Sequence, residues 1–203
     1  VFVLTREIDR LEAADALLTL NPQRLFFEKP LVSARGQEDV REEDWRLQID
    51  VLLTGVFLMT QAVVRQSMIP RRGGSIVHVA SITGMGGWPM RSAYTAAKAG
   101  VIKLNEMLAT EWAQYNIRTN CVSPGVTRTA MIDDLIRDGL ADLERYDRRT
   151  PLGRIAETEE IADVVAFLAS DRASYITGQN LRADGGWVAW GNLDAAGFPE
   201  QAG

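Results

Sequence analysis

Three side chains that can move a proton lie in one segment of this 203-residue chain: Ser81, Tyr94 and Lys98. Residues four apart on a helix share one face, so a helix here would place the Lys98 ammonium beside the Tyr94 ring. A nearby cation stabilises the phenolate form of tyrosine, which makes the phenol usable as an acid and a base. Ser81 follows the apolar segment 76–80 and can hold a carbonyl or carbinol oxygen. These residues predict a proton-transfer site.

A tyrosine and a lysine at this spacing also occur as a packed ring beside a lysine that snorkels to solvent. The surrounding sequence favours chemistry. Ser81 follows a strand that the Gly73-Gly74 turn introduces, and a second apolar strand ends at Pro124-Gly125. Ligands of parallel sheets bind beyond the carboxyl ends of the strands. We therefore expect both loops to line one cleft.

The hydrophobic pattern predicts the elements that position these residues. Strands are expected at 1–4, 23–27, 76–80, 117–122 and 179–183, and helices at 9–18, from Trp45 to before Pro70, at 94–108, 131–137 and 157–169. Alternating strands and helices indicate right-handed βαβ units and a parallel sheet covered on both faces. The prediction is an α/β, Rossmann-like, doubly wound sheet in a single domain at 1–190, followed by a loose tail at 191–203.

Composition narrows the function classes. The chain is 46% apolar and carries 22 basic against 27 acidic residues, a net charge of −5, with no basic block, which argues against a nucleic-acid partner. The most apolar run, 51–59, is far shorter than the roughly 20 residues that span a bilayer, so no membrane is expected. The single cysteine, Cys121, reads as a buried strand residue, which fits a reducing, cytoplasmic location.

The chain starts within a strand-like segment. Val1 begins a strand already under way, so we expect the N-terminal part to be incomplete.

His78, the only histidine, lies mid-strand among apolar residues and is expected to be packed and hydrogen-bonded, and we expect no metal site. Trp88, Met90 and Met131 lie near the expected cleft, where they either form an apolar substrate wall or only pack the loop.

Together these motifs resemble one family from about Glu42 to Trp187. The spacing of Ser81, Tyr94 and Lys98, the Pro124-Gly125 loop and the ending Tyr175-Ile-Thr-Gly178 with Asp184-Gly185-Gly186 look like the short-chain dehydrogenase/reductase family. The resemblance implies hydride exchange between NAD or NADP and a small-molecule carbonyl or secondary alcohol. It also implies a homodimer or homotetramer assembled through two long helices.

The resemblance assigns roles residue by residue. Ser81 would orient the substrate oxygen, Tyr94 would be the general acid and base, and Lys98 would assist Tyr94 and bind the nicotinamide ribose. The loop that would flank the nicotinamide, through a backbone amide and carbonyl, consists of Pro124, Gly125, Val126 and Thr127.

The sequence departs from the family pattern in three places. No glycine-rich phosphate-binding turn precedes the motifs, so the sequence shows no recognisable binding site for the pyrophosphate. The segment 27–30 reads Phe27-Glu28-Lys29-Pro30 where the family usually carries Asn-Asn-Ala-Gly. Counting from Trp45 to Gly55 places Leu52 where the family has a proton-relay asparagine, and leucine cannot bind a water.

These departures leave alternatives open. Either the front of a longer chain is missing, or the protein is a divergent member that has lost ordinary dinucleotide binding, or both. The leading hypothesis is a nicotinamide-dependent alcohol dehydrogenase or carbonyl reductase. Its rival is a catalytically silent subunit that no longer binds dinucleotide normally and pairs with an active relative. A third candidate, a cofactor-free lyase such as a halohydrin dehalogenase, carries Arg where Lys98 stands. The sequence decides neither NAD against NADP nor the substrate.

Overall fold

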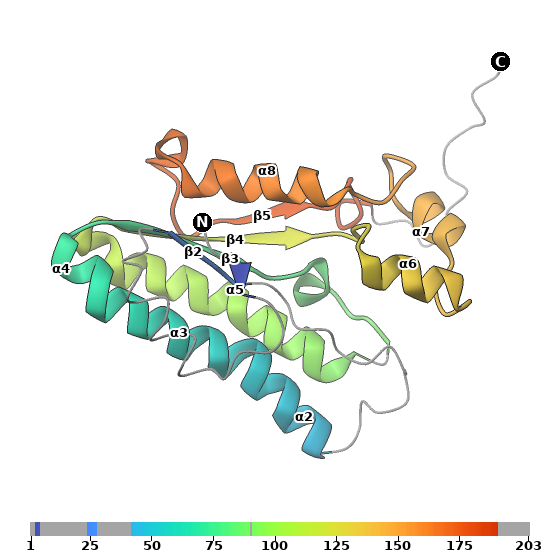
Figure 1. Cartoon of the computed structure of the whole chain (residues 1–203), viewed down its shortest axis with the longest axis horizontal. Coiled ribbons are helices and arrows are strands. Elements are labelled where there is room, and N and C mark those ends of the chain that lie inside the picture. Colours follow the sequence, from blue (N-terminus) through green and yellow to red (C-terminus); the bar gives the residue numbers. More distant parts are fainter. Residues whose placement is uncertain (1–2, 5–23, 28–41, 90, 191–203) are drawn as a thin grey trace.

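Five parallel strands form one sheet in which spatial order follows chain order (Figure 1). The computed structural model describes residues 3–4, 24–27, 42–89 and 91–190. The strands are β1 (Val3–Leu4), β2 (Arg24–Phe27), β3 (Gly74–Val79), β4 (Ile117–Pro124) and β5 (Asn180–Ala183). The predicted α/β parallel sheet is confirmed. The helix predicted at 9–18, the segment 28–30 and the tail lie outside the described residues.

One long helical rod precedes β3 and lies along the sheet. It consists of α2 (Glu42–Ile49), α3 (Gly55–Val63) and α4 (Ile69–Arg71), joined by π-helical stretches at Asp50–Thr54 and Val64–Met68. The prediction that it ends before Pro70 is wrong, because the helix continues to Arg71. A wide π-helical turn directly precedes Pro70, where the missing N–H would otherwise interrupt the regular bonding. Trp45, near the start of the rod, is 43% exposed.

Side chains of β3 and β4 alternate between the two faces of the sheet. On one face, Ile76 packs with the long rod and Cys121 packs with Val101 of α5 (Ser92–Trp112). On the other face, Val77 and Val122 pack with α8 (Thr158–Ala169). Figure 1 shows α3 and α5 on one side of the strands and α8 on the other. Both faces are therefore covered, as a doubly wound sheet requires.

The two connections on either side of β4 have opposite hands. The chain steps from β3 to β4 and from β4 to β5 in the same direction across the sheet, but α5 and α8 cover opposite faces. The prediction that every crossover is right-handed is therefore wrong for one of them, although right-handed connections are the strong rule. The second connection is long and carries α6 (Ala130–Arg137) and α7 (Leu143–Arg149), which lie beyond the end of β4 (Figure 1). This excursion carries the chain around the sheet end to its other face.

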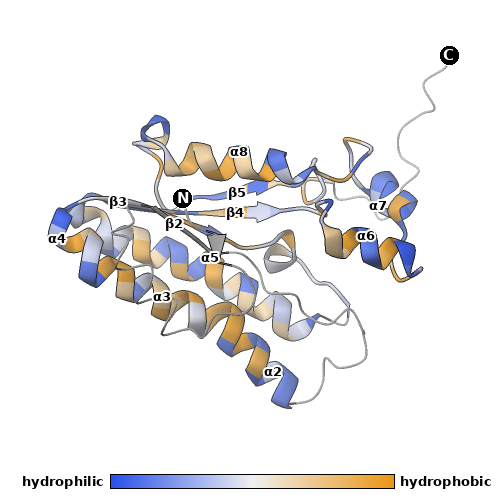
Figure 2. Cartoon of the chain, viewed as in Figure 1, coloured by the Kyte–Doolittle hydropathy of each residue, from blue (hydrophilic) through white to orange (hydrophobic). Residues whose placement is uncertain are grey.

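The rod is apolar on more than its buried side (Figure 2). Among the described residues it is one helix, Glu42–Arg71, that is long and apolar enough to cross a membrane by length and composition. The core helix of a sheet protein passes the same test, and Val63 and Met68 of the rod are fully buried against β3. Its outward side chains include Leu58, which is 52% exposed. The helix therefore serves the core and leaves an apolar outer surface.

Candidate active site

Ser81 lies just beyond the carboxyl end of β3, where Ala80 still bonds to β4 through its N–H and the Val122 carbonyl at 2.8 Å. The Ser81 backbone is extended and starts a 3₁₀ turn, Ile82–Met85. Its Oγ accepts a bond from the Thr83 N–H at 3.2 Å, and the residue is 6% exposed. This cap fixes the hydroxyl through its oxygen, which leaves the O–H proton directed elsewhere.

Lys98 is anchored at the same strand end. It is 2% exposed, and its Nζ donates to the Val79 carbonyl at 2.8 Å. The loop after Ser81 lies against the helix here, because a Cβ on Gly84 would come within 2.8 Å of the backbone of Lys98 and Ala99. Only glycine permits this approach. The serine loop and the lysine are thus held against one another.

Tyr94 and Lys98 share one face of α5, as their spacing predicts. The Lys98 Nζ lies 5.8 Å from the centroid of the Tyr94 ring, and Tyr94 is 8% exposed. The structure thus brings the phenol, the ammonium and the serine hydroxyl to the carboxyl end of β3.

Leu52 packs against Tyr94 and Ala97 in a small apolar cluster. It is 1% exposed and lies in the π-helical stretch Asp50–Thr54 of the rod. The counted position of Leu52 therefore does fall beside the candidate site. The Leu52 side chain contacts Tyr94 through apolar atoms only, whereas an asparagine at this position could have formed a hydrogen bond.

Replacing Leu52 with Ala should lower the free energy of unfolding by about 2–5 kcal/mol, because a fully packed side chain is lost and a cavity remains beside Tyr94. Urea denaturation followed by circular dichroism measures this change. Leu52→Met keeps the volume and should lose less than about 1.5 kcal/mol. An equal loss in both variants would contradict close packing at this position.

Several backbone N–H and C=O groups of the second loop, at the end of β4, form hydrogen bonds to other parts of the protein. The Gly125 N–H donates to the Ala183 carbonyl at 2.9 Å, and the Val126 carbonyl accepts from the Ala156 N–H at 3.0 Å. The Thr127 hydroxyl donates to the Gly125 carbonyl at 3.2 Å. Pro124 ends the strand, and β3 and β4 are neighbours. The structure thus places this loop beside the Ser81 loop but engages the Gly125 amide and the Val126 carbonyl elsewhere.

The donors at β3 and α5 suit the nicotinamide riboside end of a dinucleotide. An ammonium, a phenol and a serine hydroxyl converge there, and such groups bind ribose hydroxyls and a carbonyl oxygen. Thr83 adds a buried hydroxyl without a hydrogen-bond partner, and buried polar atoms normally have one. Such a group fits a site that receives a polar ligand. The residues expected near the phosphates lie before residue 42, mostly outside the described ranges.

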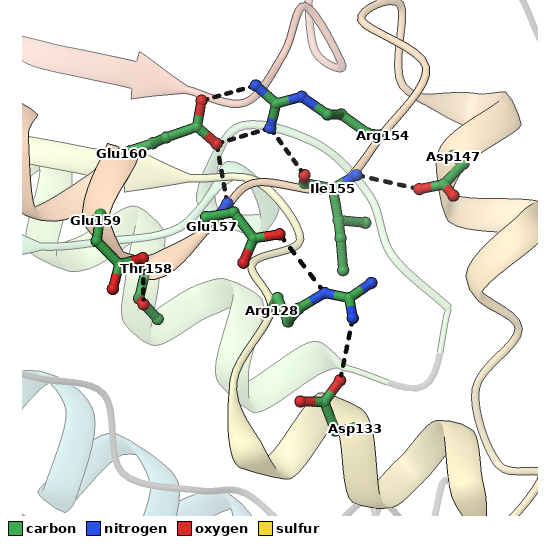
Figure 3. A network of polar contacts seen from close by, with 9 residues as sticks. All are labelled: Arg128, Asp133, Asp147, Arg154, Ile155, Glu157, Thr158, Glu159 and Glu160. Atoms are coloured by element: carbon green, nitrogen blue, oxygen red, sulfur yellow. Dashed lines mark hydrogen bonds and ion pairs between the residues drawn. The ribbon is translucent and has the colours of Figure 1, made fainter.

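A polar network holds the base of the α6 and α7 excursion (Figure 3). Thr127 and Ala156 form a parallel bridge. Beside it, Arg128 lies 3.9 Å from an oxygen of Asp133 and 3.7 Å from one of Glu157. Exposed ion pairs of this kind contribute little individually. Their effect is to pin both ends of the excursion next to the Pro124 to Thr127 loop, and the sequence pattern did not reveal them.

A second part of the network in Figure 3 orders the start of α8. Arg154 binds both carboxylate oxygens of Glu160 at 2.7 Å. This hydrogen bonding, with a further bond from the Glu157 N–H, lowers the pKa of Glu160 to about 2. The Ile155 N–H donates to Asp147 of α7 at 3.1 Å. The carboxylate of Glu160 therefore stays charged throughout the neutral range and caps the helix.

His78 belongs to a buried network that joins four elements. Its Nε2 lies 3.2 Å from the Thr60 hydroxyl and its Nδ1 lies 3.4 Å from Asn105 Oδ1, which also accepts from the Thr119 hydroxyl at 2.8 Å. Because the amide oxygen only accepts, Nδ1 carries the proton and Nε2 accepts. The predicted packed and hydrogen-bonded role is confirmed. Burial lowers the pKa of His78 to about 4, against the opposing hydrogen bond to Asn105.

Protein stability should therefore fall as the pH drops from 6.5 to 4. Across this window the unfolded chain binds a proton at His78 that the folded state excludes, so stability is complete above pH 6.5 and is lost toward pH 4. The loss attributable to this residue is about 3 kcal/mol. Urea denaturation at a series of pH values measures it. His78→Gln removes the titration, so parallel pH profiles for the two proteins would contradict the assignment.

Cys121 is fully buried and its Sγ faces the Val101 carbonyl at 3.9 Å. Burial raises the pKa of its thiol to about 12. A thiol in this state is neutral at physiological pH and unreactive. The prediction of a packed strand residue is confirmed.

Comparisons with known proteins agree with this geometry. A family model described as Enoyl-(Acyl carrier protein) reductase matches residues 28–188. The 3-oxoacyl-(acyl-carrier-protein) reductase FabG of Thermotoga maritima is 47% identical over 149 residues, which cover 73% of this chain and 59% of that protein. The chain thus spans less than two thirds of the length of this relative.

Two solved structures share the fold. An oxidoreductase of the short chain dehydrogenase/reductase family from Burkholderia thailandensis matches with a TM-score of 0.81 and 31% identity, over 90% of this chain and 71% of that one. A gluconate 5-dehydrogenase from Burkholderia cenocepacia in complex with NADP and tartrate matches with a TM-score of 0.78 and 28% identity, over 89% and 71%. The family model covers more than half of the chain, and the chain belongs to the short-chain dehydrogenase/reductase family.

Proposed function

We propose that this protein is an NAD(P)-dependent oxidoreductase that exchanges a hydride between the nicotinamide and a small carbonyl compound or secondary alcohol. One observation carries the proposal. The Lys98 ammonium, fixed by the Val79 carbonyl, lies 5.8 Å from the centre of the Tyr94 ring at the strand end that also presents Ser81.

Each of these residues has a distinct task in the reduction. The Ser81 O–H donates to the carbonyl oxygen and fixes its position. The Tyr94 O–H transfers its proton to that oxygen as negative charge develops on it. Lys98 stabilises the phenolate that remains, and its buried ammonium is held at a defined place for this purpose. When bound, a reduced nicotinamide would supply the hydride for this reduction.

The relatives support the cofactor and the reaction class. The Thermotoga maritima relative is named a 3-oxoacyl-(acyl-carrier-protein) reductase, and the Burkholderia cenocepacia structure holds NADP. We propose Tyr94 and Lys98 as the residues that hold the ribose, with Pro124 and Thr127 flanking the nicotinamide. Because the Gly125 N–H and the Val126 carbonyl form hydrogen bonds within the protein, we propose that these two groups hold the loop in place.

A cofactor titration tests the proposal against its rival. The packing of Leu52 on Tyr94 favours a silent subunit, since it replaces a polar neighbour with hydrocarbon. Purified protein should enhance the fluorescence of NADPH or NADH saturably and then oxidise the bound cofactor when a ketone is added. Saturable binding would contradict the silent subunit, which is not expected to bind the dinucleotide, and absence of binding to either cofactor would overturn both the ribose assignment and the enzyme.

We further propose a homodimer built on the outer faces of the two long helices. Phe57 and Leu58 of α3 are 37% and 52% exposed, and Met107 of α5 is 43% exposed. Exposed large apolar side chains on both helices favour an interface. Light scattering should show a dimer or tetramer that Leu58→Glu shifts toward the monomer, and a monomeric parent protein would contradict the proposal.

A further inference from the structure

Three distant segments meet in a single stack of rings beyond the sheet. The indoles of Trp88 and Trp187 lie with their centroids 5.5 Å apart and their planes 18° from parallel. The guanidinium of Arg149 lies over the Trp187 ring at 4.8 Å. Trp88 belongs to the loop between Ser81 and Tyr94, Arg149 ends α7, and Trp187 follows β5.

Trp187 is a fixed platform for this stack. The Asp184 carboxylate accepts bonds from the N–H groups of Gly186 and Val188 at 3.0 and 2.9 Å, which closes the turn that carries the indole. Arg149 donates to the carbonyls of Trp187 and Trp190, both at 3.2 Å. Trp187 itself is 9% exposed. The backbone around Trp187 is thus held by the Asp184 carboxylate and by the Arg149 guanidinium.

The platform adjoins the second site loop. A Cβ on Gly125 would meet the Cα of Asp184 at 2.9 Å, so the turn that carries Trp187 lies directly against the Pro124-Gly125 loop. Trp88 reaches this platform from the other site loop, between the serine and the tyrosine. The stack therefore bridges the two loops that bracket the candidate active site.

Trp88 is less enclosed than its partner. Trp187 is buried, whereas Trp88 is partly exposed, and a Cβ on its loop neighbours Gly86 and Gly87 would meet no atom within 4 Å. This loop is thus anchored through the Trp88 indole, whereas the space beside Gly86 and Gly87, where a side chain would project, is open. An indole that is stacked on one side and partly exposed offers a flat apolar surface, which favours contact with another ring.

We propose that Trp88, braced by Trp187 and Arg149, is a specificity-determining wall that selects carbonyl substrates with a flat ring next to the reacting carbon. The proposal rests on the oxidoreductase function proposed above and names its substrate class. Substrate pockets combine apolar walls with a few polar groups that fix orientation, here Ser81 and Tyr94. Trp88 acts by positioning the ring of the substrate and touches no reacting atom.

The kinetic test compares two ketones, acetophenone and 2-butanone. Trp88→Ala should raise KM for acetophenone about tenfold, the size of one ring-on-ring contact, and change KM for 2-butanone less than about twofold, with kcat nearly unchanged. Trp88→Phe keeps a flat ring and should restore most of the affinity. Trp45→Ala, which removes an indole that is 43% exposed on α2, is the matched control and should change neither KM. Equal effects of Trp88→Ala on the two ketones would overturn the proposal.

A binding measurement separates this proposal from the proposed function. Acetophenone or 1-phenylethanol should perturb the tryptophan fluorescence of the parent protein saturably, and Trp88→Ala should weaken that binding about tenfold. If the parent protein reduces no ketone but binds the aromatic ligand, and Trp88→Ala loses this binding, the specificity wall is supported and the oxidoreductase function is rejected. Turnover of acetophenone with unchanged KM and unchanged binding in Trp88→Ala would reject the wall and keep the enzyme.

Discussion

Replacing Tyr94 with Phe should lower kcat/KM for carbonyl reduction by about 10²–10⁴-fold, the range that a positioned general acid contributes. The ring stays in the cluster with Leu52 and Ala97, because phenylalanine has the same apolar body. Only the proton donor is lost. The free energy of unfolding should therefore change little, and the dissociation constant of the cofactor should rise only by the loss of one ribose hydrogen bond, about two- to tenfold.

Steady-state reduction of a ketone, followed by the absorbance of the reduced cofactor, measures this effect. Tyr175→Phe is the control, since Tyr175 is fully exposed and should lose no activity. A Tyr94→Phe protein that reduces its ketone at the parent rate would show that another group supplies the proton. Equal damage in both variants would point to a general loss of fold.

Replacing Lys98 with Met should reduce kcat/KM by at least about 10²-fold and should also weaken cofactor binding by about tenfold. Methionine fills the channel of the aliphatic stem but carries no charge. The phenolate loses its stabilising cation, and the Val79 carbonyl loses the donor that lies at 2.8 Å. This substitution should therefore raise the dissociation constant of the cofactor as well as lower the rate.

Fluorescence titration with the reduced cofactor and initial rates on the same protein separate the two effects. Lys103 of α5 is an exposed lysine in an ion pair with Glu106, and Lys103→Met is the matched control. Unaltered cofactor affinity in Lys98→Met would show that this lysine does not bind the ribose. A rate equal to that of Lys103→Met would remove its role in proton transfer.

The local geometry of the candidate site could be read from the sequence because it depends on short spacings. Residues 94 and 98 had to share a helical face, and Ser81 had to follow the apolar strand before it. The structure places both in this way. Helix and strand periods determine such relations directly.

Other features depend on contacts that no short window contains. The helix α7, with its charged LERYDRR sequence, buries no side chain and has no clear apolar stripe, so the pattern gave no signal for it. The passage of the rod through Pro70 depends on the π-helical turn before it. The stacking of Trp88 on Trp187 joins positions far apart in the chain. Tertiary packing, and not local propensity, decides all three.

Ser81, at the end of β3, and Tyr94 and Lys98, in α5, come from elements that follow one another in the chain. Loop closure over a single helix carries a modest entropic penalty. During synthesis a domain folds as its elements emerge from the ribosome. A nascent chain can therefore set the phenol beside the ammonium as soon as α5 has formed, because both side chains belong to that helix.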